Sequence, residues 1–328
     1  MDKELSFSII VPVYRRNDEL TELLDSLTAQ SDKDFEILIL EAPSDADATE
    51  LCKTYEQKLN IVHRIDNGSR SARRNLGIEM SHGNYCLLFD SDVILPTHYI
   101  ATVRKALQTH YVDCFGGPDS ADNSFNTTQK AVNYAMTSIM TTGGIRGGTK
   151  KVNSFLPRAF NMGFSKEAYQ KVGGYREMIG EDVDLSMRIR EAGFSIQLIP
   201  EAVVVHKRRI TLTRFFRQVY TFGKARVLLT KLHPGSLKIM HLLPTAFTLG
   251  TCFLVVCAIV WRWWCILPLV LFALLTFTES LIRNKSLAVA ALSIITSFTQ
   301  LFGYGTGLLD ELITKRASQT AAEQLYRQ

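Results

Sequence analysis

An apolar run ends in two carboxylates, one residue apart, in the segment Tyr85-Cys86-Leu87-Leu88-Phe89-Asp90-Ser91-Asp92. A short run of large apolar residues that closes in acid is typical of a strand buried in a parallel sheet. The carboxyl ends of such strands border the crevice where open α/β sheets bind ligands. Two carboxylates there would suit Mg²⁺ or Mn²⁺ carrying a phosphorylated substrate, although Asp-Ser-Asp also forms ordinary turns.

Strands and helices alternate around this segment. Apolar runs predict strands at 6–13, 35–40, 61–64, 196–199 and 202–205, and helical spacing predicts helices near 20–27, 47–58 and 70–80. This order predicts an α/β fold with a doubly wound, mostly parallel sheet and right-handed connections. The glycine clusters at 116–118 and 143–148 indicate either a substrate lid or irregular connections.

Three apolar stretches follow, at about 241–261, 263–282 and 287–309. Each is close to the roughly 20 residues that a helix needs to cross a bilayer, so two or three transmembrane helices are expected after a soluble domain. The third stretch contains Gly303, Gly305 and Gly307. These glycines indicate close helix packing, a kink, or a segment that does not fully cross.

The soluble domain is expected to be cytoplasmic, because residues 1–4 lack the basic start and apolar core of a signal peptide. The positive-inside bias agrees at four basic residues that flank the first two stretches and disagrees at Arg262; the four are Lys231, Lys238, Arg283 and Lys285. We therefore expect a multi-pass protein of a bacterial inner membrane.

Composition excludes several classes of protein. The chain has 328 residues, a formal charge of +5 and six cysteines. Its cysteines form no Cys-x-x-Cys pair, so they are expected to be reduced apolar residues and neither a disulfide framework nor a zinc site. No Gly-x-Gly-x-x-Gly follows the first strand and no P-loop is present, which disfavours a dehydrogenase and a nucleotide kinase or ATPase.

Five elements together resemble a family-2 glycosyltransferase in order and approximate spacing, over about residues 6–226. They are Ser8-Ile9-Ile10-Val11-Pro12-Val13-Tyr14, Ala72-Arg73-Arg74-Asn75-Leu76-Gly77-Ile78, Asp90-Ser91-Asp92, Gly173-Gly174-Tyr175 and Glu181-Asp182. The resemblance implies a GT-A fold, a nucleoside-diphosphate sugar donor, a divalent metal (Mg²⁺ or Mn²⁺) and inversion at the anomeric carbon.

The resemblance and the apolar stretches together predict a division of the chain. A catalytic domain spans 1–235, with a donor-binding half at 1–110, an acceptor-binding half at 111–206 and a basic amphipathic segment at 207–235. Transmembrane helices occupy 236–310, and a polar tail occupies 311–328.

At the donor end, the resemblance implies that Pro12 and Tyr14 border the nucleotide base. Glu41 stands where the family usually has an aspartate that contacts uracil. The uracil contact of the family implies a UDP-sugar donor. Glutamate in place of that aspartate leaves the identity of the base open. Plain packing is the alternative for Tyr14.

At the diphosphate end, the resemblance implies that Arg74 lies near the base or the diphosphate, with a solvated helix position as its alternative. Asp90 is implied near the ribose or the metal, and Asp92 on the metal. Some relatives use a histidine at the place of His206 as a further metal or diphosphate ligand, whereas a lone histidine after a strand is often structural.

Glycosyl transfer requires a base for the acceptor hydroxyl and positive charge for the departing diphosphate. Asp182 is the candidate base. It follows Gly180 at a predicted helix start, where backbone N–H groups and the helix dipole favour an ionised carboxylate. Helix capping is the alternative for Asp182. Glu181 is expected to orient acceptor hydroxyls, and Asp184 to be structural.

A basic segment precedes the apolar stretches, and its Arg217 is a candidate diphosphate contact. Its aromatic and basic side chains also suit an anionic membrane surface, and nucleic acid binding is disfavoured beside a membrane anchor. Where processive synthases carry Gln-x-x-Arg-Trp, this chain has Thr221 and Phe222 in place of the Arg and Trp. One sugar per encounter is therefore expected.

The expected function is that of a membrane-anchored, inverting, non-processive hexosyltransferase. It would add one sugar to a hydroxyl of a lipid-linked saccharide in surface polysaccharide or glycolipid assembly of the cell envelope. One alternative is transfer to a polyprenyl phosphate, whose nucleophile is already ionised and needs no base. Another is a catalytically silent membrane scaffold.

Overall fold

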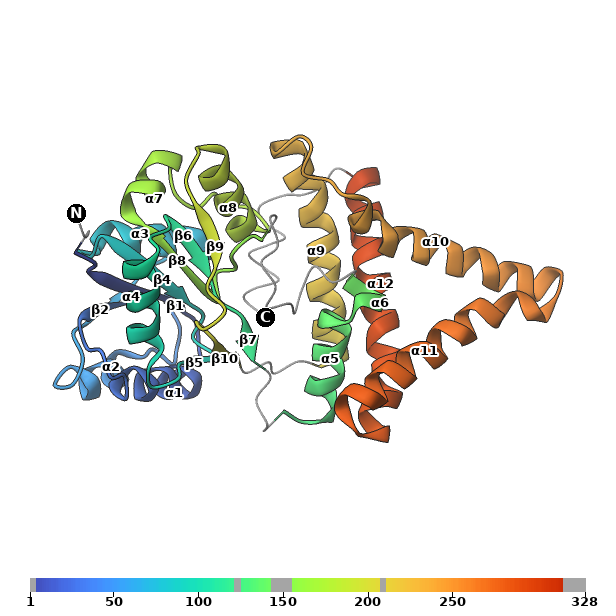
Figure 1. Ribbon diagram of the computed structural model, residues 1–328, viewed down its shortest axis with the longest axis horizontal. Helices are drawn as coiled ribbons and strands as arrows, with labels where there is room; N and C mark the ends of the chain where they lie inside the picture. Colours follow the sequence, from blue (N-terminus) through green and yellow to red (C-terminus); the bar gives the residue numbers. More distant parts are fainter. Residues whose placement is uncertain (1–3, 121–124, 143–154, 207–210, 315–328) are drawn as a thin grey trace. The chain divides into compact units, whose positions relative to one another are not determined.

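The structure is a computed structural model that describes residues 4–120, 125–142, 155–206 and 211–314. The chain divides into two compact units (Figure 1). The first contains the described residues of Met1–Asp122 and Thr149–Lys207, and the second those of Asn123–Gly148 and Arg208–Leu325.

A seven-stranded sheet forms the centre of the first unit, in the order β3-β2-β1-β4-β8-β6-β9. Four neighbouring strands are parallel: β3 (Ile61–Ile65), β2 (Phe35–Glu41), β1 (Phe7–Val13) and β4 (Tyr85–Phe89). Antiparallel β8 (Asn161–Ser165) separates β4 from β6 (Cys114–Gly116), which is parallel to β9 (Ile196–Leu198). The predicted mostly parallel sheet is confirmed, and β6 and β8 are strands that the sequence did not predict.

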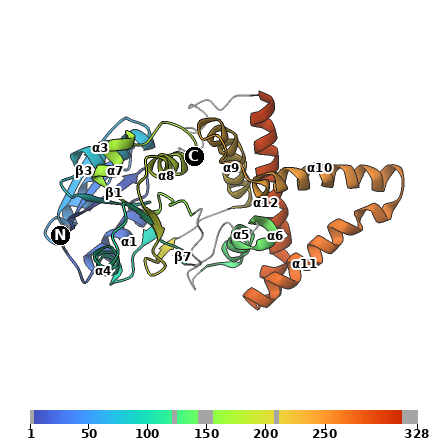
Figure 2. The ribbon, with the colours of Figure 1, turned by 45° about the horizontal axis from the view of Figure 1, so that its top comes forward.

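Helices cover both faces of this sheet because its strands alternate their apolar side chains between two cores. Ile9 and Val11 of β1 belong to the core that contains the leucines of α1 (Asn17–Thr28) and the apolar face of α4 (Tyr99–Thr109). Ile10 belongs to the opposite core. That core also takes residues from α3 (Arg70–Met80), α7 (Lys166–Val172) and α8 (Glu181–Glu191). Figure 2 shows the two groups of helices on opposite sides of the sheet.

A buried carboxylate ties β2 to its neighbours. Glu36 accepts hydrogen bonds from the Ser8 hydroxyl at 2.6 Å and from the backbone N–H of Gly83 at 3.3 Å, and it also bonds the ring and the backbone N–H of His82. Burial, the largest single influence, raises the pKa of Glu36, but these hydrogen bonds together outweigh it, so the pKa is lowered. Glu36 therefore stabilises the fold mainly in its ionised form.

The pairing of β1 with β4 ends earlier than its pairing with β2. β1 pairs with β2 through Val13 and Glu41 but with β4 only through Ile10 and Leu88. Pro12 has no backbone N–H to donate to a neighbouring strand. Strand pairing therefore does not join the segments that follow β1 and β4, at the sheet edge where the ligand crevice is predicted, although the side chains of Arg16 and Asp92 bond across it.

A second, three-stranded sheet lies beside the acidic end of β4. It has the order β5-β10-β7, formed by Val93–Ile94, Val204–His206 and Asp119–Ser120. β5 begins directly after Asp92, and its Val93 pairs with the backbone of His206. This sheet fixes the chain on the far side of the Asp90-Ser91-Asp92 turn. Helix α2 (Thr49–Tyr55) completes the described elements of the first unit.

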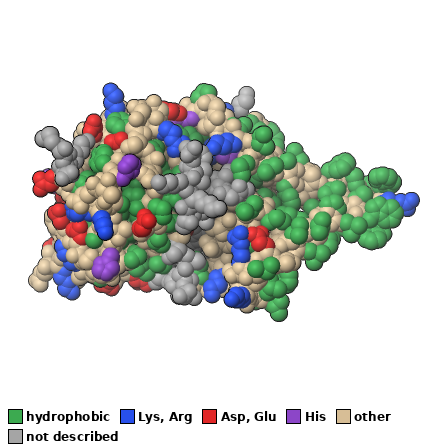
Figure 3. Space-filling view, in the orientation of Figure 1, with side chains coloured by type: hydrophobic (Ala, Val, Ile, Leu, Met, Phe, Trp, Pro, Cys, Tyr) green, Lys and Arg blue, Asp and Glu red, His purple; other side chains and the backbone are tan. Residues whose placement is uncertain are grey.

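The second unit is helical. It contains α5 (Thr127–Thr137), α6 (Ile139–Thr142), α9 (Leu212–Leu232), α10 (Ile239–Val260), a 3-10 turn (Trp263–Ile266), α11 (Leu267–Asn284) and α12 (Leu287–Thr314). Three of its helical segments are long and apolar enough to cross a membrane: Ile239–Val260, Trp263–Asn284 and Leu287–Thr314. These confirm the predicted apolar helices. Exposed apolar side chains gather on α10 and α11 (Figure 3), as expected for helices that contact lipid.

The glycines of α12 serve close helix packing. α12 is continuous over Leu287–Thr314. A Cβ atom on Gly307 would lie 2.0 Å from the carbonyl oxygen of Tyr220 in α9, and one on Gly305 would lie 2.7 Å from the carbonyl oxygen of Pro244 in α10. Of the interpretations left open by the sequence, the structure therefore selects close packing over a kink.

Helices α5 and α6 belong to the second unit although they precede β8 in the chain. The hydroxyl of Thr296 in α12 donates to the carbonyl oxygen of Ala131 at 2.9 Å, and the hydroxyls of Tyr134 and Ser138 each donate to Glu279 of α11 at 2.8 Å. The described residues 125–142 thus pack with the C-terminal helices, a grouping that the predicted boundary at residue 235 does not contain.

Candidate active site

The predicted acidic clusters meet at Arg74. Its Nη1 donates to Glu181 Oε1 at 2.7 Å, and its Nη2 donates to Asp90 Oδ1 at 3.3 Å. The guanidinium carbon also lies 5.3 Å from the centre of the Tyr175 ring. Asp90 follows β4 and Glu181 begins α8, so one side chain joins two segments that are far apart in the sequence.

The start of α3 places this arginine. The Ser69 hydroxyl caps the helix by accepting the backbone N–H of Ala72 at 3.1 Å. Arg70 and Arg74, one helical turn apart, then project from the same side of the helix, and Arg70 also pairs with Asp90 Oδ1. Sequence reasoning missed Arg70, although its spacing of four residues from Arg74 was a signal.

Asn75 fixes the turn before α8. Its Oδ1 accepts the backbone N–H of Tyr175 at 2.8 Å and the hydroxyl of Tyr169 at 2.7 Å, while its Nδ2 donates to the carbonyl oxygen of Tyr175 at 2.9 Å. Gly173 and Gly174 have φ angles of 82° and 75°, which favour glycine. The Gly-Gly-Tyr motif is thus a shaped turn that α3 holds in place.

Asp92 lies beside the loop that follows β1. Its Oδ2 accepts a hydrogen bond from Arg16 Nη1 at 2.8 Å, and its side chain is 17% exposed. Arg15, just before Arg16, has a φ of 50°, a conformation that is costly for a residue with a side chain. The sequence did not predict a role for Arg16.

The carboxylates of Asp90 and Asp92 are oxygen ligands of the type that a hard divalent cation prefers. Within the described ranges, no group of three or more His, Cys, Asp or Glu side chains could hold a metal by itself. Mg²⁺ and Mn²⁺ commonly bind through one or two carboxylates and complete their coordination with substrate phosphates and water. The donor set therefore fits a cation that binds together with a diphosphate.

Glu41 is fully buried at the end of β2. Its Oε2 accepts the backbone N–H of Ala48 at 2.9 Å and lies 2.8 Å from His63 Nε2. Its Oε1 is buried and has no hydrogen-bond partner among the residues that the structure describes. In the neighbouring strand β1, Pro12 is buried beside the end of β2. Tyr14, which follows β1, is partly exposed, and the Arg15 guanidinium lies over its ring.

Asp182 is in the first turn of α8. The helix is preceded by Gly180, with a φ of 79°, and begins at Glu181. Asp182 Oδ1 accepts the backbone N–H of Val183 at 2.8 Å, and Oδ2 accepts that of Ala159 at 3.4 Å. Its side chain is 19% exposed and lies 3.8 Å from Arg158 Nη1. These contacts orient the carboxylate and leave part of it accessible.

Asp184 differs sharply from Asp182. It is fully buried and pairs with Arg176 Nη1 at 3.2 Å and with Arg188 Nε at 2.8 Å. Arg188 also donates to the carbonyl oxygens of Val172 and Gly174. Asp184 therefore supports the helix start and the glycine turn, which agrees with its expected structural role.

Two predicted residues, His206 and Arg217, are located by the strand and the helix that carry them. The backbone of His206 pairs with that of Val93, next to Asp92, and its side chain falls outside the description. Arg217 lies on α9 in the second unit. Their proposed contacts with metal or diphosphate stay predictions.

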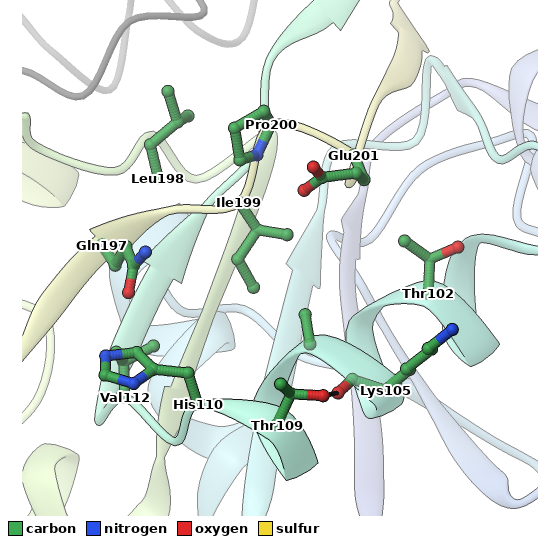
Figure 4. A pocket seen from close by; sticks show the side chains of 11 residues that line it. Thr102, Lys105, Thr109, His110, Val112, Gln197, Leu198, Ile199, Pro200 and Glu201 are labelled. Carbon is green, nitrogen blue, oxygen red and sulfur yellow. Dashed lines mark hydrogen bonds between the residues drawn. The ribbon is translucent and has the colours of Figure 1, made fainter.

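A separate cavity of about 520 Å³ lies between the end of α4 and the segment after β9. Its polar lining includes Lys105, His110, Gln197 and Glu201 (Figure 4). None of the predicted site residues lines it.

Comparison with known proteins identifies a family. Residues 5–220 match the protein family described as "Glycosyltransferase like family 2". Glycosyltransferase GlyA of Streptococcus pneumoniae is 32% identical over 111 residues, which cover 32% of this chain but only 16% of GlyA. Succinoglycan biosynthesis protein ExoA of Rhizobium meliloti is 25% identical over 251 residues, covering 73% of this chain and 74% of ExoA.

A solved structure supports the fold. The mannosyltransferase PcManGT from Pyrobaculum calidifontis, in complex with GDP-Man and Mn²⁺, superposes with a TM-score of 0.63 and 15% sequence identity. The superposition covers 90% of this chain and 87% of that protein. It confirms the predicted GT-A fold.

Proposed function

This chain belongs to glycosyltransferase family 2, and we propose that it moves one sugar from a nucleoside-diphosphate sugar to a hydroxyl of a membrane lipid-linked saccharide. The relative ExoA is named for polysaccharide biosynthesis, and PcManGT was solved with a nucleotide sugar and Mn²⁺. The three apolar helices favour an acceptor that is itself in a membrane. A cytoplasmic catalytic domain at a bacterial inner membrane is part of the same proposal.

One observation carries the proposal: Arg74 contacts both Asp90 and Glu181. Asp92 is two residues beyond Asp90, and Asp182 is next to Glu181, so the metal and base candidates lie in neighbouring segments of one site. Glycosyl transfer needs a group for the leaving diphosphate and a group for the acceptor hydroxyl on opposite sides of the same sugar. The juxtaposition of these segments supports such an arrangement.

On the donor side, Asp92 and Asp90 would hold the divalent cation, which supplies positive charge for the departing diphosphate. Glu41, held by Ala48 and close to His63, is proposed to receive the nucleotide base, with Pro12 and Tyr14 beside it. A UDP-sugar remains the proposed donor.

On the acceptor side, Asp182 is proposed as the general base. The acceptor oxygen attacks the anomeric carbon from the face opposite the diphosphate, while Asp182 takes the hydroxyl proton. The bond from the anomeric carbon to the diphosphate oxygen breaks, and its electron pair leaves with the nucleoside diphosphate. The configuration at the anomeric carbon is thereby inverted.

The second unit is proposed to hold the enzyme at the membrane. On α9, Phe216 is an exposed large apolar residue, with Arg214 and Arg217 exposed beside it in the chain. Apolar and basic side chains together suit an anionic lipid surface. A contact of Arg217 with the diphosphate is proposed as well.

The test is a donor panel. Membranes that contain the full chain are incubated with Mn²⁺, a lipid extract and single UDP- or GDP-sugars, and release of nucleoside diphosphate and labelled lipid is measured. The proposal expects one donor to give both products. Folded protein that releases no nucleoside diphosphate from any donor would refute it and favour the scaffold. Labelling of added polyprenyl phosphate, with no labelling of lipid-linked saccharide, would instead identify the alternative acceptor.

A further inference from the structure

A buried arginine joins the two halves of the site. We propose that Arg74 is a positioning residue, which sets the separation between the Asp90–Asp92 turn and the first turn of α8, and that it does not bind the donor itself. This inference rests on the proposed function and assigns Arg74 a role different from the diphosphate contact expected from the sequence.

The carboxylates that already bind Arg74 argue against its direct contact with the donor. Arg74 is 1% exposed, its Nη1 and Nη2 already donate to Glu181 and Asp90, and its Nε is buried with no hydrogen-bond partner among the described residues. A donor phosphate would have to displace Glu181 or Asp90 in order to reach the terminal nitrogens of the guanidinium. Arg70, which shares Asp90 with Arg74, is more exposed.

Charge explains why the arginine is needed. Glu181 is 9% exposed on its side chain, and a carboxylate buried to this extent requires a partner. If Arg74 were absent, Glu181 and Asp90 would be two like charges around one vacated position, and they would repel each other. α8 adds to this repulsion because Asp182 and Asp184 are in the same first turn.

A shift of Glu181 would be passed to the base. Asp182 is the next residue, and the backbone N–H groups of Val183 and Asp184 both bond to the carbonyl oxygen of Gly180, at 3.1 and 3.0 Å. The first turn is thus one hydrogen-bonded unit with Glu181 as its anchor to α3. A misplacement of about 1 Å can lower turnover by about 10²-fold, so loss of the anchor should act on the chemical step.

The experiment uses the full chain in detergent with the variants Arg74→Met, Glu181→Gln and both together. Arg74→Met should lower turnover at saturating donor by about 10²-fold. Calorimetric titration with UDP or GDP in Mn²⁺ should show nucleotide binding within about twofold of the wild type. The double variant should be no slower than Arg74→Met alone, because both changes break the same link.

Arg176→Met is the matched control. It removes an arginine that pairs with Asp184 of α8 and leaves the contacts of Glu181 and Asp90 in place. Arg74→Lys keeps one positive charge and should fall between the wild type and Arg74→Met. Amide exchange of the peptide around 178–186 gives a readout that does not require turnover. It should speed up by at least about tenfold in Arg74→Met and by less in Arg176→Met.

Two results would overturn the inference. One is a loss of UDP or GDP binding greater than about tenfold in Arg74→Met with amide exchange unchanged, which would make Arg74 a donor ligand. The other is multiplication of the two single losses in the double variant. If the wild type turned over no donor, the proposed function would fail, while amide exchange would still decide whether Arg74 positions α8.

Discussion

Replacing Asp182 with asparagine separates the catalytic role of this side chain from its structural role. Asparagine has the same shape, and its Oδ1 can still accept the backbone N–H of Val183, now found at 2.8 Å. Its amide nitrogen would face the backbone N–H of Ala159, where Asp182 Oδ2 now accepts a long hydrogen bond of 3.4 Å. Loss of that bond at a partly exposed site should cost only about 1 kcal/mol of stability.

The expected catalytic cost is larger. A general base contributes about 10²–10⁴-fold to the rate, which corresponds to about 3–5 kcal/mol in the activation free energy. Asp182→Asn should therefore lower turnover by at least about 10²-fold while the melting temperature falls by only about 2–4 °C. Nucleoside-diphosphate release and thermal unfolding of the same preparation measure the two effects.

Asp184→Asn is the control from the same helical turn. It disrupts a fully buried pairing with Arg176 and Arg188, which should cost about 3–5 kcal/mol of stability. Its turnover per folded molecule should change far less than that of Asp182→Asn. If Asp182→Asn kept its turnover within about threefold of the wild type, the general-base mechanism would be refuted, and an acceptor that is already ionised would explain the result.

Two further predictions concern stability. The pKa of Glu36 is lowered in the folded protein, so Glu36→Gln should reduce the melting temperature at pH 6–7. The difference in melting temperature from the wild type should shrink as the pH falls below 4.5, the ordinary pKa of a glutamate. A difference that does not depend on pH would contradict this role of Glu36. Gly307→Ala should destabilise the helical unit by about 3 kcal/mol or more. Its Cβ would lie 2.0 Å from the carbonyl oxygen of Tyr220, a backbone atom that cannot move aside as a flexible side chain can. Gly250→Ala is the control, because its added Cβ would lie more than 4 Å from every described atom beyond its chain neighbours and its own helix backbone, and it should be neutral or stabilising in thermal unfolding in detergent. Equal effects of the two substitutions would argue against the packing of α9 on α12.

The sequence predicted the elements whose signal is local. β4 is a continuous apolar run and β1 is one apart from Ser8, and both are fully buried in the centre of the sheet. The three apolar helices were visible from length and composition alone. β8, by contrast, contains Asn161 and Gly163 and becomes a strand only through its pairing with β4 and β6, which no local pattern encodes.

The grouping of α5 with the C-terminal helices was hidden for a similar reason. It depends on contacts between residues far apart in the sequence. Thr296 donates to Ala131, and the hydroxyls of Tyr134 and Ser138 donate to Glu279. A helical pattern gives the apolar face of a segment but not the partner that the face packs against.

The sequence predicted the motifs of the candidate site but not the ion pairs that join them. Motif spacing selected Asp92 and Asp182, and the structure brings the segments that carry them together through Arg74. Helical periodicity places Arg74 on α3 but cannot tell whether an arginine points to solvent, to a ligand or to a buried carboxylate. Arg16 was missed because its contact with Asp92 depends on the strained loop at Arg15.

The most direct test of the proposed donor site is calorimetric titration of the full chain with UDP and with GDP, in Mn²⁺ and in excess EDTA. The wild type should bind one of the two nucleotides in Mn²⁺ and lose that binding in EDTA, and Asp92→Asn should weaken binding in Mn²⁺ by at least about tenfold. Binding that is equally tight in EDTA and in Asp92→Asn would contradict the assignment of Asp92 and, with it, the proposed donor site.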